Sequence, residues 1–249
     1  MNRRCFSYFF LLHLFYFTLN TSICQTATID FKNYRIHQQI KGDSDFIQML
    51  LPYLDSIQRY KNKVIGFSMS KLVKYQPESG LGNFMADAML RMAEKKGNKK
   101  VDAAVINYGG IRSWLPKGEI TIATVYQLVP FENTIVLAEM TGQLLQALLD
   151  RAAASGGWPM AGISCSIKDN KAMNVLIKNH PIAPDTTYWI ATSDYLAKGG
   201  DGCSMLKNNA FQNLGYLYRD ALIEYIISIT QEGRPISSNI EKRVVYENE

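Results

Sequence analysis

A short apolar segment that leads into a glycine-rich loop is the feature that most constrains this sequence. Residues 101–106 (Val-Asp-Ala-Ala-Val-Ile) are too few for a typical helix and predict a buried strand. The strand continues into Asn107-Tyr-Gly-Gly-Ile-Arg112, where the glycines permit turns and a close approach of the backbone to a ligand. Asn107 and Arg112 add hydrogen-bonding groups suited to phosphate or carboxylate. The loop is predicted either to bind a ligand at a strand end or to form a plain turn with a solvated arginine.

A second glycine-rich loop follows another predicted strand. Residues 188–193 form that strand, and residues 195–202 form its exit loop, with Asp201 between two glycines. Phe131 lies between the two loops in the sequence, and Tyr195 begins the second. These rings are predicted either to pack in the core or to stack on a base, which contributes about 1–3 kcal/mol per base. Asp201 is predicted either to accept a hydrogen bond from a ribose hydroxyl or to stabilise its own turn. The loop lacks the ligand pattern of a calcium site.

Helical and extended patterns alternate along the rest of the chain. The spacing of apolar residues predicts helices at 43–61, 81–96, 143–154 and 216–231, with a shorter helical segment at 123–129. Pro52 lies inside the first helix, which is therefore predicted to start or to kink there. Thr141 is predicted to cap the third helix. Extended segments are predicted at 64–75, 101–106, 119–122, 134–140, 160–167, 173–178, 188–193 and 243–246. This interleaving predicts an α+β, or mixed α/β, fold.

Residues 1–24 are predicted to be a secretory signal peptide. Two arginines precede a nearly continuous apolar run at 6–19, and small polar residues follow it. The run is too short for a stable transmembrane span. Cleavage near Cys24 is favoured over lipid modification of Cys24, because Ile23 is larger than the residue that usually precedes a lipidated cysteine. The protein is thus predicted to be exported to the periplasm or the cell envelope.

The exported part begins with an arm at 25–42, predicted to be either a short strand or a loose segment. Without the two signal-peptide arginines, 25 basic and 22 acidic residues remain, which leaves a net charge of +3. So small an excess does not predict binding to nucleic acid or to a membrane surface. Export would allow Cys165 and Cys203 to form a disulfide. Two buried thiols are an equally good prediction.

Five motifs occur in an order and spacing that resemble one known family. They are Leu81-Gly-Asn-Phe-Met-Ala-Asp-Ala88, Asn107-x-Gly-Gly-Ile-Arg112, Pro130-Phe-x-Asn133, Thr141-Gly142 at a helix start, and Tyr195-x-x-x-Gly-Gly-Asp-Gly202. Over residues 64–231 they resemble the C-terminal, substrate-binding domain of the 5′-nucleotidase and 2′,3′-cyclic phosphodiesterase family. The resemblance implies one domain at 63–249, with a mixed sheet and flanking helices. It also implies that the helix at 43–62 is similar to the helix that joins the two domains in that family.

The resemblance implies roles for seven residues. Phe131 and Tyr195 would clamp a base, with Tyr195 standing where the family often has phenylalanine. Asp201 would contact the ribose, and Asn133 would lie near the nucleoside. Gly162 would allow a close approach to the base. The remaining two residues, Asn107 and Arg112, would lie on the phosphate side.

One family position differs on the phosphate side. An arginine is usual a few residues before the Leu-Gly-Asn segment, and this chain has Tyr75 there with Lys74 beside it. A lysine offers a point charge rather than a bidentate fork.

The catalytic residues of the family have no counterpart in this chain. The resemblance implies phosphate-ester hydrolysis by two metal ions held in a separate N-terminal domain, which needs clustered His, Asp and Asn ligands. Outside the signal peptide the chain has only His37 and His180, and it has no Asp-x-His and no Gly-Asn-His-Asp. Neither histidine has a context that suggests a general base. We therefore expect no catalytic residue and no cofactor here, with divalent metals only in a partner catalytic domain.

Three hypotheses follow from this sequence. The chain is either the nucleotide-binding half of a 5′-nucleotidase that acts with a separate metallophosphoesterase chain, or an envelope module that binds nucleosides or nucleotides without catalysis. The third hypothesis is an exported domain that has lost its site. The first is favoured, because the binding motifs are present and the metal ligands are absent.

Overall fold

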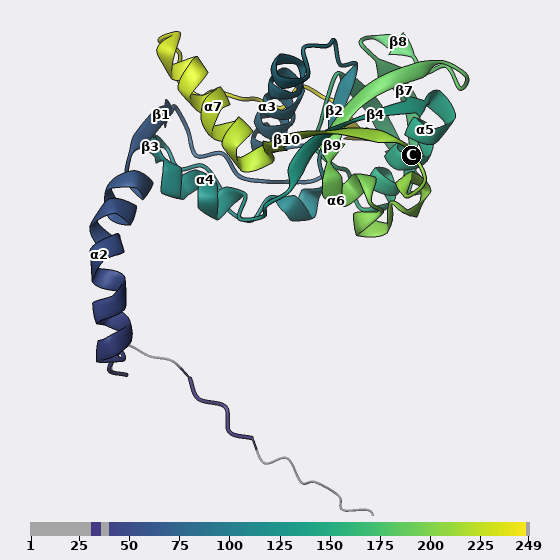
Figure 1. Cartoon of the computed structure of the whole chain (residues 1–249). Coiled ribbons are helices and arrows are strands. Elements are labelled where there is room, and N and C mark those ends of the chain that lie inside the picture. Colours follow the sequence, from purple (N-terminus) through teal and green to yellow (C-terminus); the bar gives the residue numbers. More distant parts are fainter. Residues whose placement is uncertain (1–30, 36–39, 248–249) are drawn as a thin grey trace, which may run out of the picture. The chain divides into compact units, whose positions relative to one another are not determined.

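The computed structural model describes residues 31–35 and 40–247 (Figure 1). The predicted signal peptide, the lipid-anchor question at Cys24 and most of the predicted arm lie outside these residues. Residues 31–35 contain neither helix nor strand. The chain divides into two units at residues 1–49 and 50–249, and the described elements that form the fold lie in the second.

The first helix, α2, spans Ser44–Lys61. The Asp43 carboxylate accepts hydrogen bonds from the backbone N–H groups of Asp45 and Phe46, at 2.9 and 3.0 Å, and so caps the helix start. Pro52 lies within α2, so the alternative in which the helix starts at the proline is wrong. None of the residues of α2 is buried, although its apolar residues recur at helical spacing.

A five-stranded sheet forms the centre of the fold, with the strand order β10-β4-β9-β2-β5. Strands β2 (Ala103–Val105) and β9 (Thr187–Ser193) are parallel, and the other neighbouring pairs are antiparallel. The remaining strands of this sheet are β4 (Thr134–Thr141), β5 (Met160–Ala161) and β10 (Phe211–Leu217). The mixed sheet with flanking helices confirms the predicted α+β class.

Each face of the central sheet has its own apolar core, because successive side chains of a strand point to opposite faces. Ala104 and Ile106 contribute to the core under α3 (Gly80–Gly97) and α7 (Tyr218–Gln231), which lie side by side (Figure 1). Ala103 and Val105 contribute to the core under α5 (Gly142–Ala154). As predicted, the Thr141 hydroxyl caps α5 by accepting from the Leu144 N–H at 3.2 Å.

Two smaller sheets complete the fold. One has the order β11-β6-β7-β8 and the other pairs β1 with β3. Their strands are β1 (Val64–Ser68), β3 (Gly118–Thr121), β6 (Ile163–Lys168), β7 (Lys171–Ile177), β8 (His180–Pro181) and β11 (Val244–Tyr246). The shorter helices are α4 (Ile122–Leu128) and α6 (Asp194–Ala197), with 3-10 turns at Tyr108–Gly110, Gly200–Gly202 and Ser204–Leu206.

Two predicted boundaries are wrong. The helix predicted from residue 216 begins at Tyr218, because residues 211–217 form the unpredicted edge strand β10. The segment predicted as one strand at 160–167 is two strands in different sheets. They are separated by Gly162, whose φ of +74° turns the chain out of the central sheet.

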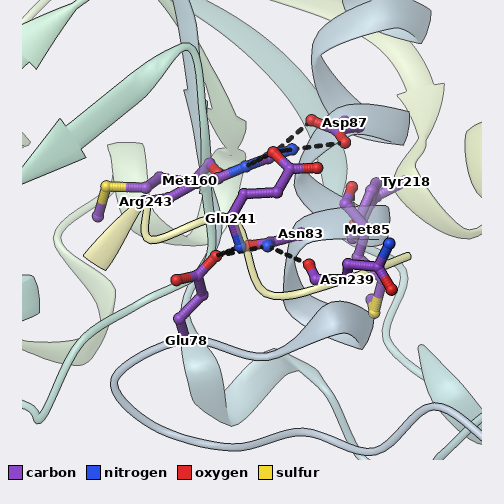
Figure 2. A network of polar contacts seen from close by, with 9 residues as sticks. All are labelled: Glu78, Asn83, Met85, Asp87, Met160, Tyr218, Asn239, Glu241 and Arg243. Atoms are coloured by element: carbon purple, nitrogen blue, oxygen red, sulfur yellow. Dashed lines mark hydrogen bonds and ion pairs between the residues drawn. The ribbon is translucent and has the colours of Figure 1, made fainter. Parts of the chain in front are cut away.

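A network of hydrogen bonds and ion pairs connects the C-terminal segment to α3 (Figure 2). Arg243 makes a bidentate ion pair with Asp87, with N–O distances of 2.7 and 2.8 Å, and also donates to the Met160 carbonyl at 2.9 Å. Asn83 donates to the Glu78 carboxylate and to the Asn239 carbonyl. This network places β11 beside β6, so the last described strand belongs to the folded domain.

Both cysteines of the domain are buried and unpaired. Cys165 and Cys203 lie in the same apolar core, under α5. Of the two predictions for these residues, the buried thiols are confirmed. Burial raises the pKa of each thiol to about 11.

Candidate functional site

Three loops meet at one end of the central sheet, and we call them the site loops: 107–112, 130–133 and 194–202. The first follows β2 and the third follows β9, and these strands are parallel, so both loops leave from the same end of the sheet. The second precedes β4, which is antiparallel to β9 and therefore begins at that end. The Thr134 N–H donates to the Asp194 carboxylate at 3.0 Å and joins the second and third loops. The two glycine-rich loops therefore lie at the same end of the central sheet.

Asp201 connects the first and third site loops. Its carboxylate accepts a hydrogen bond from the Asn107 amide at 2.6 Å and another from the Tyr195 hydroxyl at 2.7 Å. The Asp201 N–H donates back to the Tyr195 hydroxyl at 3.1 Å, and the Asp201 carbonyl accepts from Arg151 at 2.7 Å. The carboxylate therefore stabilises a contact between two loops, which is more than the local turn considered from the sequence.

Backbone conformation explains the glycines around Asp201. The φ of Asp201 is +48°, in the left-handed region, which aspartate tolerates better than most residues. A Cβ on Gly200 would lie about 2.5 Å from the Tyr195 ring, so only glycine lets the ring lie flat on the backbone here. One face of the ring is therefore covered by the loop. The Tyr195 side chain is still 41% exposed.

Phe131 and Arg112 lie close together on the solvent side of the site. Phe131 is also 41% exposed, and the Arg112 guanidinium carbon lies 5.8 Å from its ring centroid, at the outer limit of a cation–π contact. The core-packing alternative for the two rings does not fit this exposure. Among the described residues, the Arg112 side chain makes one hydrogen bond, a 3.5 Å contact to the Gly109 carbonyl, which is long. Its remaining donors face solvent.

A small pocket lies behind Phe131, with a volume of about 20 Å³, which is room for about one water molecule. Asn133 lines it, and within the described part of the chain its side-chain amide has no hydrogen-bond partner. The other lining residues come from the site loops, from residues directly before these loops, from α3 and from the start of α7, and include Met85, Met89, Asn107, Gly110 and Tyr218.

Lys74 belongs to this end of the molecule, although the motifs predict only a point charge next to Tyr75. Its ammonium group donates to the Ile111 carbonyl at 2.7 Å and lies 4.3 Å from the centroid of the Tyr108 ring. Burial, together with the nearby charge of Arg112, lowers the pKa of Lys74. Tyr75 is 68% exposed. The sequence contains a signal for this arrangement, because Lys74 lies two residues after the buried Leu72 in an extended segment and so points to the same side, whereas Tyr75 points to the other.

Two of the predicted site residues have structural roles in this arrangement. The Asn107 side chain is buried and its amide is hydrogen-bonded to Asp201, so this amide is not directed to a phosphate. Gly162 lies beside Asp102 at the amino end of β2, where a Cβ would come within 2.5 Å of the Asp102 carbonyl oxygen. Asn107 follows the opposite end of β2. The site therefore brings together six of the seven predicted residues, and Gly162 is not among them.

The described residues offer no cluster of three or more His, Cys, Asp or Glu side chains that could hold a metal ion. In the same part of the chain, no helix is long and apolar enough to cross a membrane.

Comparison with known proteins identifies related sequences. The profile of the family described as 5′-nucleotidase, C-terminal domain matches residues 57–208. The trifunctional nucleotide phosphoesterase protein YfkN of Bacillus subtilis is 27% identical over 89% of this chain and 16% of its own length. A 5′-nucleotidase of Vibrio vulnificus is 29% identical over 90% of this chain and 41% of its own length. The chain thus spans less than half the length of these curated relatives.

Solved structures of proteins named as 5′-nucleotidases have a fold similar to that of this chain. The 5′-nucleotidase precursor of Thermus thermophilus superposes with a TM-score of 0.71 and 26% identity, over 82% of this chain and 44% of that protein. A 5′-nucleotidase-like structure from Staphylococcus aureus superposes with a TM-score of 0.66 at 16% identity, over 85% of this chain and 46% of that protein, and supports the fold alone.

Proposed function

The chain belongs to the 5′-nucleotidase C-terminal domain family, and from this premise we propose that it is the nucleotide-binding half of a 5′-nucleotidase. Its catalytic partner would be a separately made metallophosphoesterase chain that holds the divalent metals, and both would act in the cell envelope after export. The observation that carries the proposal is the meeting of six predicted site residues on three loops at one end of the central sheet.

The base would lie between the rings of Phe131 and Tyr195. Each ring is partly exposed, and Tyr195 has one face already covered by its own loop, so its other face can stack on a base. The free amide of Asn133 lies at the pocket behind Phe131 and can hydrogen-bond to a polar edge of the nucleoside.

The phosphate would be bound by Arg112 and Lys74. The Arg112 guanidinium has donors that face solvent, and a charge-assisted hydrogen bond from such a group contributes about 1.5–3 kcal/mol. Lys74 adds an ammonium group near Arg112; burial and then the charge of Arg112 lower the pKa of this group. A pair of cations at this position favours a nucleotide over a nucleoside.

Calorimetric titration of the purified protein with AMP and with adenosine tests the binding role. We expect both to bind, and AMP to bind more tightly. Equal affinities for AMP and adenosine would instead indicate an envelope module that binds nucleosides and makes no contact with the phosphate that adds affinity. Absence of binding by either ligand, alone and with a candidate catalytic chain, would contradict the proposal and favour a domain that has lost its site.

Two substitutions locate the site. Phe131→Ala should weaken AMP binding by at least about fivefold, given the usual energy of base stacking. The matched control is Phe67→Ala, which removes a similarly exposed ring from β1. Arg112→Ala should weaken AMP binding more than adenosine binding, with Arg91→Ala on α3 as its control. Equal effects of site and control substitutions would place the ligand elsewhere.

The catalytic partnership is tested by phosphate release from AMP. The candidate metallophosphoesterase chain should release phosphate faster when this protein is added, and this protein alone should release none with added divalent metal. Full activity of the catalytic chain that does not change on addition of this protein would refute the partnership, while leaving the binding role to be judged by calorimetry.

A further inference from the structure

The Asp201 carboxylate is the only negatively charged side chain among the six converging site residues, and it already accepts hydrogen bonds from other side chains of the protein. Its two oxygens accept from the Asn107 amide and the Tyr195 hydroxyl, at 2.6 and 2.7 Å. Its backbone N–H and carbonyl are also hydrogen-bonded, to Tyr195 and Arg151. Each of the polar atoms of Asp201 therefore has an intramolecular partner before any ligand binds.

Two of the six converging residues keep side-chain groups that a ligand can contact, and one of these groups, an amide, can accept as well as donate. Arg112 keeps guanidinium N–H groups that face solvent, and the Asn133 amide has no partner among the described residues. An ionised carboxylate has about four lone-pair sites that could accept from a sugar hydroxyl, and two of those of Asp201 are already used. Here the hydroxyl would arrive as a third donor to a carboxylate whose charge is already shared between two hydrogen bonds.

The Tyr195 hydroxyl is one of the two groups that already hydrogen-bond to the Asp201 carboxylate. It donates to the carboxylate and accepts from the Asp201 N–H, so it is bonded on both sides. A phenylalanine at position 195 would keep the ring on Gly200 and would leave Oδ1 of Asp201 without its donor.

We propose that Tyr195 is a specificity-determining residue whose hydroxyl occupies the Asp201 carboxylate, so that the site does not discriminate between nucleotides by their sugar hydroxyls. The proposal rests on the nucleotide-binding function and concerns only which nucleotides bind. The base and the phosphate supply the affinity, and ribonucleotides and deoxyribonucleotides bind alike.

The test is a calorimetric comparison of AMP, 2′-deoxy-AMP and 3′-deoxy-AMP with the wild-type protein and with Tyr195→Phe. The wild-type affinities should agree within about threefold. In Tyr195→Phe the freed carboxylate oxygen can accept from the sugar, so AMP should bind about tenfold more tightly than the deoxynucleotide that lacks the hydroxyl in contact.

Two further variants separate this role from a structural one. The double variant Tyr195→Phe with Asp201→Asn should lose the preference gained in Tyr195→Phe, because the charged acceptor is gone. Tyr53→Phe removes an exposed hydroxyl on α2 and should leave all affinity ratios unchanged. Thermal melts of the variants show whether each is folded.

Three results would overturn the inference. A wild-type preference for AMP of tenfold or more would show that the sugar hydroxyls are read despite Tyr195. Equal weakening of all three ligands by Tyr195→Phe would show that the hydroxyl only holds the ring. Failure of the wild-type protein to bind any of the three would refute the proposed function as well, and so differs from the first two results.

Discussion

Lys74 is a single side chain whose charge state should affect the proposed binding of a phosphate. Its pKa is lowered by burial and by the charge of Arg112, so in the free protein it loses its proton below its ordinary value of 10.5. Below that pKa the ammonium attracts the phosphate, and above it the attraction is lost. We therefore predict that AMP affinity falls as the pH rises through a midpoint below 10.5, measured by calorimetry.

Substitution of Lys74 provides the matching measurement at constant pH. Lys74→Met should weaken AMP binding roughly tenfold at pH 7, as expected for the loss of one charge-assisted hydrogen bond, and should abolish the alkaline decline. Lys117→Met, which removes an exposed lysine on the way to β3, is the control. An unchanged AMP affinity in Lys74→Met would show that Lys74 does not contribute to phosphate binding.

The motifs predicted which loops meet at one end of the central sheet better than they predicted the partners of each residue. Residue order and glycine spacing identify the loops, because these reflect backbone turns that the sequence encodes locally. The partners of Asn107, Asp201 and Tyr195 depend on the parallel pairing of β2 with β9, which joins residues far apart in the chain. The position of Gly162 could not be predicted for the same reason, because its proximity to Asp102 depends on the pairing of β5 with β2.

The buried cysteines give a prediction about reactivity. With a pKa of about 11 instead of 9.0, the Cys165 and Cys203 thiols carry about one hundredth of the usual thiolate at pH 8, and burial blocks access as well. Both should resist a thiol reagent at pH 8 in the folded protein and react quickly in denaturant. Rapid labelling of either cysteine under native conditions would show that this core opens.

At the scale of elements, the C-terminal strand depends on Arg243, which forms ion pairs with Asp87 and with Glu241. The Arg243 side chain is 13% exposed and is largely removed from water, whereas that of Asp87 is 35% exposed and is partly buried. Arg243→Met should lower the free energy of unfolding by about 3 kcal/mol in a denaturant titration, because it leaves Asp87 without its countercharge.

Two variants control for this effect. Arg234→Met removes one member of an exposed ion pair with Glu232 and should change the free energy of unfolding by less than about 1 kcal/mol. Combining Arg243→Met with Asp87→Leu should recover part of the lost stability, since no uncompensated charge remains. If Arg234→Met and Arg243→Met have equal effects, the network in Figure 2 does not hold the strand.

Helices were easier to predict than edge strands for a physical reason. Helix α3 has a strong apolar face and an N-cap serine, so local residues determine both its pattern and its start. Strand β10 has mostly exposed or half-buried residues, contains Gly215, and is held by its pairing with β4. Its sequence therefore lacks the alternation that would separate it from the helix that follows.

For the whole molecule, burial indicates where the independently folding domain begins. None of the residues of α2 is buried, whereas the cores begin with Ile65 on β1 and extend to Val244 on β11. The site loops all lie within this range. Helix α2 is thus expected to contribute little to the stability of the domain or to its ligand site.

We predict that a chain of residues 63–249 folds and keeps its AMP affinity within about twofold of that of the longer protein. Its melting temperature should change by no more than roughly 2 °C, because less than about 1 kcal/mol of packing is removed. The opposite truncation, which deletes residues 236–249, removes buried Ile236 and Val244 together with Arg243, and should abolish cooperative unfolding or lower the melting temperature sharply. If the 63–249 chain loses cooperative unfolding, α2 contributes to the core, and the domain boundary inferred from burial is wrong.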